Sequence, residues 1–108
     1  MNHRIIVVHW TGLKDLDASH RVMNEPTLSE SRTDIKSGGV LNVSAHYLVD
    51  RTGEIYRMLP DTIFARHAIG INYYAIGIEN VGDGKSALTF EQLTANVYLI
   101  KLLKEIYL

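Results

Sequence analysis

Hydrophobic residues recur along the chain in runs that predict a small set of strands. Residues 5–8 are continuously apolar, which is typical of a strand that is covered on both faces. Residues 43–50 alternate between the two faces of a strand, and residues 54–59 follow as a return strand. Between them, Arg51-Thr52-Gly53 predicts a hairpin turn with the glycine at a positive φ. Residues 75–81 predict one more strand.

A short helix is predicted early in the chain. Residues 13–24 have a weak helical period, and Pro26 ends this segment because the residue before a proline avoids the α region. Residues 27–42 are rich in Ser, Thr, Asp and Gly and predict a long surface loop, which in so small a domain is more often functional than accidental. Asn72 predicts a turn that leads into the strand at 75–81.

A longer helix is predicted at the end of the chain. Thr89 and Gln92 fit a capping box, in which two side chains satisfy the free amides of the first helical turn. Neither a Gly or Asn cap nor a further strand follows before Leu108, so we expect the domain to be incomplete at its C-terminus. The apolar face predicted for this helix consists of Phe90, Leu93, Val97, Ile100, Leu103 and Tyr107.

The order of these elements indicates an α/β fold with a mixed central β-sheet flanked by helices, in a single domain over residues 1–108. The chain is 46% hydrophobic and 21% charged, which is ordinary for a globular domain. It contains no cysteine, so disulfides and thiolate metal sites are excluded.

Charge and hydropathy exclude two classes of partner. The formal net charge of -1 gives no electrostatic case for binding nucleic acid or a membrane surface. No segment has enough consecutive apolar residues to span a bilayer. Met1 lies too close to the first strand for a signal peptide, so we expect a cytoplasmic protein if Met1 is native, and an envelope or secreted one if a leader was removed.

His9 and Glu79 are the strongest candidates for chemistry. His9 directly follows the first apolar run, and ligands gather at the carboxyl ends of strands in open α/β sheets. It is either a ligand or a histidine that caps the strand edge. Glu79 lies on a small-residue face of a buried strand, where a carboxylate is costly unless it is paired. It therefore predicts a metal ligand, a general base with raised pKa, or the partner of a buried Arg, more than a carboxylate that reaches solvent.

The other histidines and the one tryptophan carry weaker predictions. His67 lies in a loop beside glycine and either lines a cleft or sits on the surface. His46 is predicted as a core histidine that hydrogen-bonds to backbone, and His3 and His20 as ordinary surface residues. Trp10 either stacks on a substrate or packs, because an amphipathic aromatic side chain does both.

Four segments occur together in an order that is typical of one enzyme family. They are IIVVHWTG, LNVSAHYLVDRTGEIYRMLP, ARHAIGINYYAIGIENVG and the helix that follows LTFEQL. Together they resemble the zinc-dependent N-acetylmuramoyl-L-alanine amidases of type 2, whose fold is shared by peptidoglycan recognition proteins and phage-lysozyme amidases. The resemblance runs from Ile5 to the end of the chain. It implies zinc in a cleft that binds the peptidoglycan stem, and hydrolysis of the amide between N-acetylmuramic acid and L-alanine.

The same resemblance implies a role for each candidate residue. His9 matches the first zinc ligand, and Glu79 matches the carboxylate that activates the zinc-bound water in many members. His67 matches a cleft histidine that is not usually a ligand, and Arg66 replaces the tryptophan common before it. With Trp10, His67 is expected to bind the substrate.

The zinc site implied by the resemblance is incomplete in this chain. An open zinc site needs three protein ligands and one bound water. The metal lowers the pKa of that water to about 7, so a carboxylate can take its proton. In the family, the second histidine and the third ligand come after the long helix, and we expect the fold to lack that strand and loop. Ala45 stands where some members place a catalytic tyrosine, so the chain must depend on Glu79. We therefore expect this chain to be weak or inactive alone.

Three functions remain open from the sequence. The first is a zinc amidase acting on intact peptidoglycan or on smaller muropeptides. The second is a non-catalytic peptidoglycan-binding module, against which the retention of His9 and Glu79 argues, because a pure binder needs no buried carboxylate. The third is a fragment that another chain completes with the missing strand, which would show concentration-dependent assembly.

Overall fold

The computed structural model describes residues 3–24 and 43–107. The long loop predicted at 27–42 lies outside these residues, as does Pro26. The prediction of an early helix is confirmed, and the side chain of Asp15 caps it by accepting a hydrogen bond from the Ala18 amide. The elements in chain order are β1 (Ile5–Trp10), α1 (Leu16–Met23), β2 (Tyr47–Val49), β3 (Ile55–Arg57), the 3-10 turn η2 (Asn72–Tyr74), β4 (Ala75–Asn80) and α2 (Phe90–Tyr107).

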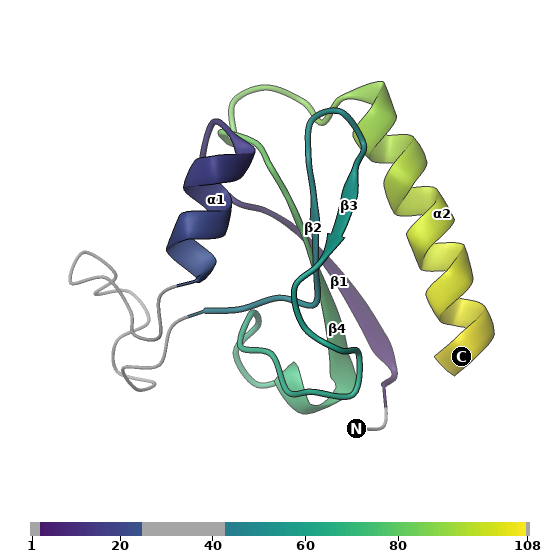
Figure 1. The fold of residues 1–108 in the computed structure, drawn as a ribbon. Helices are drawn as coiled ribbons and strands as arrows, with labels where there is room; N and C mark the ends of the chain where they lie inside the picture. Colours follow the sequence, from purple (N-terminus) through teal and green to yellow (C-terminus); the bar gives the residue numbers. More distant parts are fainter. Residues whose placement is uncertain (1–2, 25–42, 108) are drawn as a thin grey trace.

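The strands form one mixed sheet, as the sequence predicts, and their order in it is β1-β4-β2-β3. Strand β4 pairs in parallel with β1 on one side and with β2 on the other, and β3 pairs with β2 in antiparallel. The carboxyl ends of three parallel strands therefore meet at one edge of the sheet. Helices α1 and α2 lie on opposite sides of this sheet (Figure 1). In the described part of the chain, no helix is both long and apolar enough to cross a membrane.

The pleat of β4 separates two faces with different chemistry. Gly77 and Glu79 point to the side of α1, whereas Ile76 and Ile78 point to the side of α2 because side chains alternate along a strand. The α2 side is the hydrophobic core of the domain. Its buried members are Tyr47, Val49, Ile76, Ile78, Ala95, Leu99 and Leu103, with Ile6, Ile55, Ile100 and Tyr107 packed against them.

The hairpin is present, but its two strands are shorter than the alternation predicts. Gly53 adopts φ +89 in the turn, as expected. The regular pairing of β2 begins only at Tyr47 because the Gly77 amide donates to the His46 ring at 3.1 Å, where a backbone carbonyl would otherwise accept. On the other side, the amides of Met58 and Leu59 both donate to the single carbonyl of His46, which ends the β3 ladder as a bulge would.

The capping box of α2 is confirmed, but half of its predicted apolar face is wrong. Thr89 Oγ1 accepts from the Gln92 amide at 3.0 Å, and Gln92 Oε1 accepts from the Thr89 amide at 3.0 Å. Phe90 is 79% exposed, and Leu93 and Val97 are also exposed. The buried stripe instead consists of Gln92, Ala95, Asn96, Leu99 and Leu103.

Two amide side chains explain this rotation of the helix. Gln92 Nε2 donates to the carbonyls of Val49 at 3.3 Å and Val81 at 2.8 Å, where β2 and β4 end. Asn96 and Asn80 form a reciprocal amide pair, in which Asn96 Nδ2 donates to Asn80 Oδ1 at 2.7 Å. Strand ends present carbonyls that must be satisfied when buried. The helix therefore turns its amides inward at this end and leaves the bulkier apolar side chains outside.

The prediction that the first strand is covered on both faces is also wrong. Among the described strands, β1 pairs with β4 alone, so it forms an edge of the sheet. Val8, on the α2 side, is 45% exposed because α2 packs over the middle of the sheet and not over this edge. Ile5, on the α1 side, is 38% exposed. The apolar run therefore predicts the strand correctly but does not predict how deeply it is buried.

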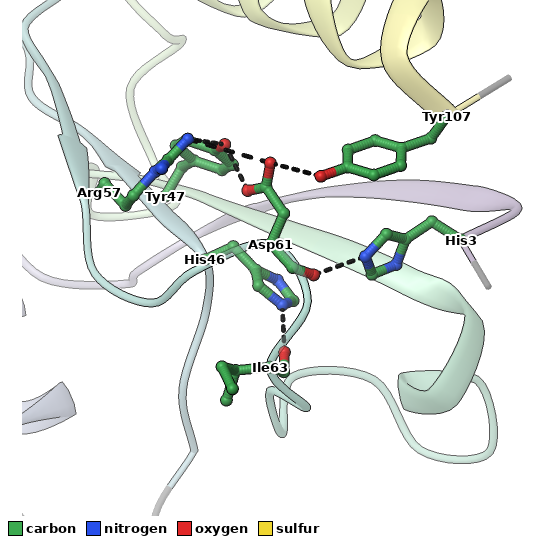
Figure 2. A network of polar contacts seen from close by, with 7 residues as sticks. All are labelled: His3, His46, Tyr47, Arg57, Asp61, Ile63 and Tyr107. Atoms are coloured by element: carbon green, nitrogen blue, oxygen red, sulfur yellow. Dashed lines mark hydrogen bonds and ion pairs between the residues drawn. The ribbon is translucent and has the colours of Figure 1, made fainter. Parts of the chain in front are cut away.

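A buried polar network around Asp61 ties the end of α2 to the sheet (Figure 2). The hydroxyl of Tyr47 donates to Asp61 Oδ1, and the hydroxyl of Tyr107 donates to Asp61 Oδ2 at 2.9 Å. The Arg57 guanidinium lies 3.9 Å from the same carboxylate. His3, expected on the surface, is only 4% exposed, because its Nε2 hydrogen-bonds to the backbone carbonyl of Asp61 and its ring packs edge-on against Tyr107.

Candidate functional site

A cavity of about 230 Å³ opens between α1 and the carboxyl ends of β1 and β4. All four residues that the sequence singles out for the site line this cavity, although they come from three separate segments of the chain. The fold therefore brings together the predicted metal ligand, the predicted catalytic carboxylate and the two predicted substrate-binding residues. The lining consists of His9, Trp10, Thr11, Leu13, Ser19, Val22, Met23, Val43, His67 and Glu79.

His9 and Glu79 are direct neighbours across two parallel strands. They are partners in the β1–β4 register, so their side chains leave the same face of the sheet at the same level. On its other side, Glu79 is in register with Leu48, which is fully buried. Glu79 itself is half-buried at the cavity wall and not at a solvated sheet edge. This is the setting in which a carboxylate can serve as a general base.

The loop that carries His67 is fixed by one side chain. Asn72 Oδ1 accepts from the amides of His67 at 3.0 Å and Ala68 at 2.8 Å. The predicted turn at Asn72 is thus confirmed. It folds the 67–72 segment back so that His67 lies over β4.

Gly77 makes room for the His67 ring. A Cβ atom built on Gly77 would lie 2.7 Å from two carbon atoms of that ring, closer than real Cβ contacts allow. Because Gly77 has no side chain, the imidazole packs directly on the strand, and we call this position on Gly77 the seat of His67. The glycine in the AIGIEN strand is needed for this close approach, which the sequence pattern alone does not reveal.

The two cavity histidines are in hydrogen-bond contact. His9 Nε2 lies 3.2 Å from His67 Nδ1, and the rings meet edge-on with centroids 5.3 Å apart. Burial lowers the pKa of His9. Burial also lowers the pKa of His67 to about 4, an effect that the charges of His9 and His46 reinforce and the Ala75 backbone carbonyl opposes. Both rings are therefore neutral at pH 7, the form in which an imidazole can bind a metal.

His46 is a core histidine, as predicted. It is fully buried, and its Nδ1 accepts from the Gly77 amide, so its Nε2 carries the proton and donates to the Ile63 carbonyl at 2.7 Å. Burial is the main cause that lowers the pKa of this ring. His46 thus holds β4 and the loop before His67 in place. His20 is exposed on α1, which confirms its prediction.

Thr11 is a structural residue of the site that the sequence interpretation missed. Its hydroxyl oxygen accepts from Ser19 Oγ at 3.0 Å, from the Leu13 amide at 3.2 Å and from the Gly82 amide at 3.4 Å. These bonds join α1 to the ends of β1 and β4 and so close one wall of the cavity. The only sequence signal was a hydroxyl residue directly after the strand, which is too common to identify it.

Trp10 is 57% exposed at the mouth of the cavity. Its indole packs over two glycines, and a Cβ atom on Gly84 would lie 2.3 Å from the ring. Gly12 sits under the same ring, with a Cβ position 3.3 Å away. Trp10 therefore packs on one side and presents the rest of its surface to the solvent. Both readings that the sequence leaves open for this residue are compatible with that geometry.

The described residues do not complete a metal site. Within residues 3–24 and 43–107, no group of three or more His, Cys, Asp or Glu side chains is placed to hold a metal ion. His9 supplies one neutral imidazole to the cavity. Ala45 is buried and offers no ligand atom or hydroxyl. The donor set in the described residues thus fits one zinc ligand and not three.

Comparison with known proteins identifies the family. A family model described as N-acetylmuramoyl-L-alanine amidase (Amidase_2) matches residues 1–108. No curated protein sequence matches the chain significantly. Among solved structures, the N-acetylmuramoyl-L-alanine amidase LysC from Clostridium intestinale URNW is 27% identical with a TM-score of 0.73, and the match covers 99% of this chain and 66% of LysC.

Two more distant structures share the fold. The amidase AmiD from E. coli, solved with the substrate anhydro-N-acetylmuramic acid-L-Ala-D-gamma-Glu-L-Lys, is 23% identical with a TM-score of 0.74, and the match covers 99% of this chain and 45% of AmiD. PGRP-SA from Apis mellifera is 16% identical with a TM-score of 0.73, and the match covers 99% of this chain and 65% of that one. The chain spans less than two thirds of the length of these three structures. The resemblance predicted from its segments is confirmed: the chain belongs to the N-acetylmuramoyl-L-alanine amidase family Amidase_2.

Proposed function

We propose that the chain provides the catalytic half of an N-acetylmuramoyl-L-alanine amidase, which hydrolyses the amide between N-acetylmuramic acid and L-alanine. The observation that carries this proposal is the register pairing of His9 with Glu79 at the wall of one cavity. A binding module has no use for a half-buried carboxylate placed beside a neutral imidazole, because burying an acidic group costs free energy. Family membership supports the same reaction.

Glu79 is the proposed general base. Its carboxylate accepts the proton of the attacking water, and the cavity limits access of other water to that reaction. Trp10 and His67 line the same cavity, and we propose that they form part of the walls of the space in which the muropeptide lies. AmiD, which shares the fold, was solved with such a substrate, an anhydro-muropeptide.

We further propose that the reaction depends on zinc and that His9 is one of its ligands. The described residues offer no complete ligand set, so the chain by itself should hold zinc weakly and turn over slowly or not at all. This separates two claims: the role of Glu79 and His9 in an amidase, and the impaired state of the 108-residue chain.

Both claims can be tested by measuring release of stem peptide from purified muropeptides, together with zinc content. We expect little turnover and less than one zinc per molecule for this chain. Any longer product of the same gene should show turnover that Glu79→Gln abolishes. Full activity with stoichiometric zinc in the 108-residue chain would contradict the second claim. Muropeptide binding without turnover in the longer product would contradict the first and favour a peptidoglycan-binding module.

A further inference from the structure

Strand β1 presents backbone groups at the free edge of the sheet. The Thr11 amide donates to the Asn80 carbonyl at 2.8 Å, and the His9 carbonyl accepts from Asn80 Nδ2 at 3.2 Å. These odd-numbered residues therefore turn their backbone groups toward β4. Because successive residues of a strand turn N–H and C=O to opposite sides, the even-numbered residues present theirs at the free edge. These residues are Ile6, Val8 and Trp10.

This edge has none of the features that usually prevent pairing with another chain. Proteins protect an exposed edge strand with charged side chains, proline, a bulge or a covering element. Strand β1 contains no charged residue and no proline, and its pairing with β4 is continuous over its whole length. Within the described residues, no other strand pairs with it, and Val8 and Trp10 are 45% and 57% exposed. The edge is therefore open to a further strand.

The side chains of the three edge residues lie on one side of the sheet. Ile6 and Val8 are in register with Ile76 and Ile78, which face α2, and Trp10 follows at the same spacing. Ile6 packs against the hydrophobic core, whereas Val8 and Trp10 remain exposed. A strand added at this edge would pair the free backbone groups and cover these two side chains together.

A second copy of the same strand matches this edge. If two β1 strands run antiparallel about a twofold axis at Val8, Val8 lies opposite the partner's Val8 and Ile6 lies opposite the partner's Trp10. Residues opposed in this way exchange both backbone hydrogen bonds, so each free N–H meets a free C=O. Aromatic and β-branched side chains also pair favourably across strands. Because β1 carries no formal charge, no like charges meet along the joined strands.

We propose that β1 is the interface of a homodimer, in which two copies join their β1 strands antiparallel about an axis at Val8. The interface is isologous, so assembly stops at two copies. The two sheets become one continuous sheet, with both α2 helices on one side and both cavities on the other. His9 then lies opposite the partner's Val7, so each copy adds an apolar side chain beside the cavity of the other. This proposal goes beyond the proposed amidase function and does not depend on it.

The dimer can be tested on the metal-free 108-residue chain by sedimentation and amide hydrogen exchange, from micromolar to millimolar concentration. A dimer should form as the concentration rises, and the Ile6, Val8 and Trp10 amides should become protected in parallel with it. The Val7 and His9 amides, which face β4, should be protected throughout. A monomer at every concentration would overturn the proposal, as would assemblies that grow beyond two copies. Edge amides protected in a monomer would show that the chain covers its own edge, which also overturns it.

Two substitutions at Val8 test the register of the pairing. Val8→Lys and Val8→Glu each place two like charges opposite one another on the axis, so each should raise the dissociation constant by about 10²-fold or more. An equimolar mixture should form dimers again, because a lysine then lies opposite a glutamate. Protected Val7 and His9 amides show that each variant is folded.

Tyr98→Lys is the matched control, because it adds the same charge at an exposed position of α2 and should leave the dissociation constant unchanged. Dimers of Val8→Lys as tight as those of the wild type would overturn the interface. A mixture of the two folded Val8 variants that stays monomeric would overturn the register about Val8. No turnover is measured, so either failure is distinct from failure of the amidase assignment.

Discussion

Two of the polar groups in the described residues, one around Asp61 and one at the cavity around His9, differ in how their donors and acceptors are satisfied. In the Asp61 network, each carboxylate oxygen accepts from a tyrosine hydroxyl, and an arginine lies beside them (Figure 2). In the cavity, two imidazoles and a carboxylate face open space of about 230 Å³. In the first group, both carboxylate oxygens accept from donors inside the protein. The second leaves capacity to bind something else.

The difference separates stability from chemistry. A matched buried network strengthens the fold, because loss of one partner leaves the others without a bond. In the open group, burial lowers the pKa values of the two imidazoles, and the cavity leaves room beside them for a ligand or a substrate. Substitutions in the two regions should therefore change different measurements, which gives a series of tests.

The largest effect is expected at Glu79. Glu79→Gln should lower stem-peptide release by about 10²–10⁴-fold, because it removes a general base, in whichever product of the gene shows turnover. The free energy of unfolding should change by less than about 1 kcal/mol, because the amide fits the same space. Glu105→Gln, an exposed change on α2, is the control and should alter neither. A strong loss of stability with retained activity would reverse our assignment of the two regions.

Asp61→Ala should give the largest loss of stability. The change removes the acceptor of two tyrosine hydroxyls and the partner of Arg57 at a site only 8% exposed. We expect the free energy of unfolding to fall by about 3 kcal/mol, measured by urea denaturation. Exposed Asp17→Ala should cost less than about 1 kcal/mol. Equal losses in the two variants would show that the network adds little.

Gly77→Ala tests the seat of His67. The added methyl group would lie 2.7 Å from the imidazole, so the ring must shift from its position on the strand. We expect a loss of about 2 kcal/mol in the free energy of unfolding, and a change in the imidazole ¹⁵N chemical shifts of His9 and His67 as their 3.2 Å contact is disturbed. Gly82→Ala is a matched control, because its nearest contact would be an ordinary 3.6 Å from Arg51 Nη1. Similar costs at both glycines would argue against a seat.

Acid should weaken the metal-free chain through the cavity histidines. The pKa of His67 is lowered from 6.5 to about 4 in the folded state, so the unfolded chain binds the proton more tightly. The free energy of unfolding should therefore fall as the pH drops from about 7 to 4. Allowing for solvent near the ring, we expect roughly 1–2 kcal/mol from this group. The slope should be smaller in His67→Phe, and an identical slope would assign it to other groups.

The smallest effect is expected from one hydroxyl of the Asp61 network. Tyr107→Phe removes the hydrogen bond to Asp61 Oδ2 and keeps the ring that packs on His3. The free energy of unfolding should fall by about 1 kcal/mol in urea. Tyr98→Phe on the exposed side of α2 should have no measurable effect. If Tyr107→Phe leaves the free energy of unfolding unchanged, water replaces the lost hydroxyl without a loss of stability.

Features that depend on neighbouring residues were predictable from the sequence. Alternation and apolar runs located the strands, and the capping box located the start of α2. The rule that ligands gather at the carboxyl ends of strands made His9 a candidate. Its association with Glu79, which the register confirms, was implied by the family resemblance. These signals are local or depend on one topological rule.

Features that depend on a distant partner were not predictable. The inward face of α2 was assigned by hydrophobicity, whereas Gln92 and Asn96 turn inward to satisfy strand ends and a buried asparagine. His3 looked like a surface residue because its partner, Asp61, is 58 positions away. Periodicity reports how apolar a position is, and it cannot report which buried carbonyl or carboxylate needs a donor.

Asp61 also bears on the order of events in folding. It lies 58 positions from His3 and 46 from Tyr107, so its bonds close long loops of chain. Loop closure of this length costs entropy that only later contacts repay, and we expect the network to form after α2 has docked. Contacts made after the transition state slow unfolding without speeding folding. The network would then lower the unfolding rate and so set how long the cavity keeps its shape once the chain has folded.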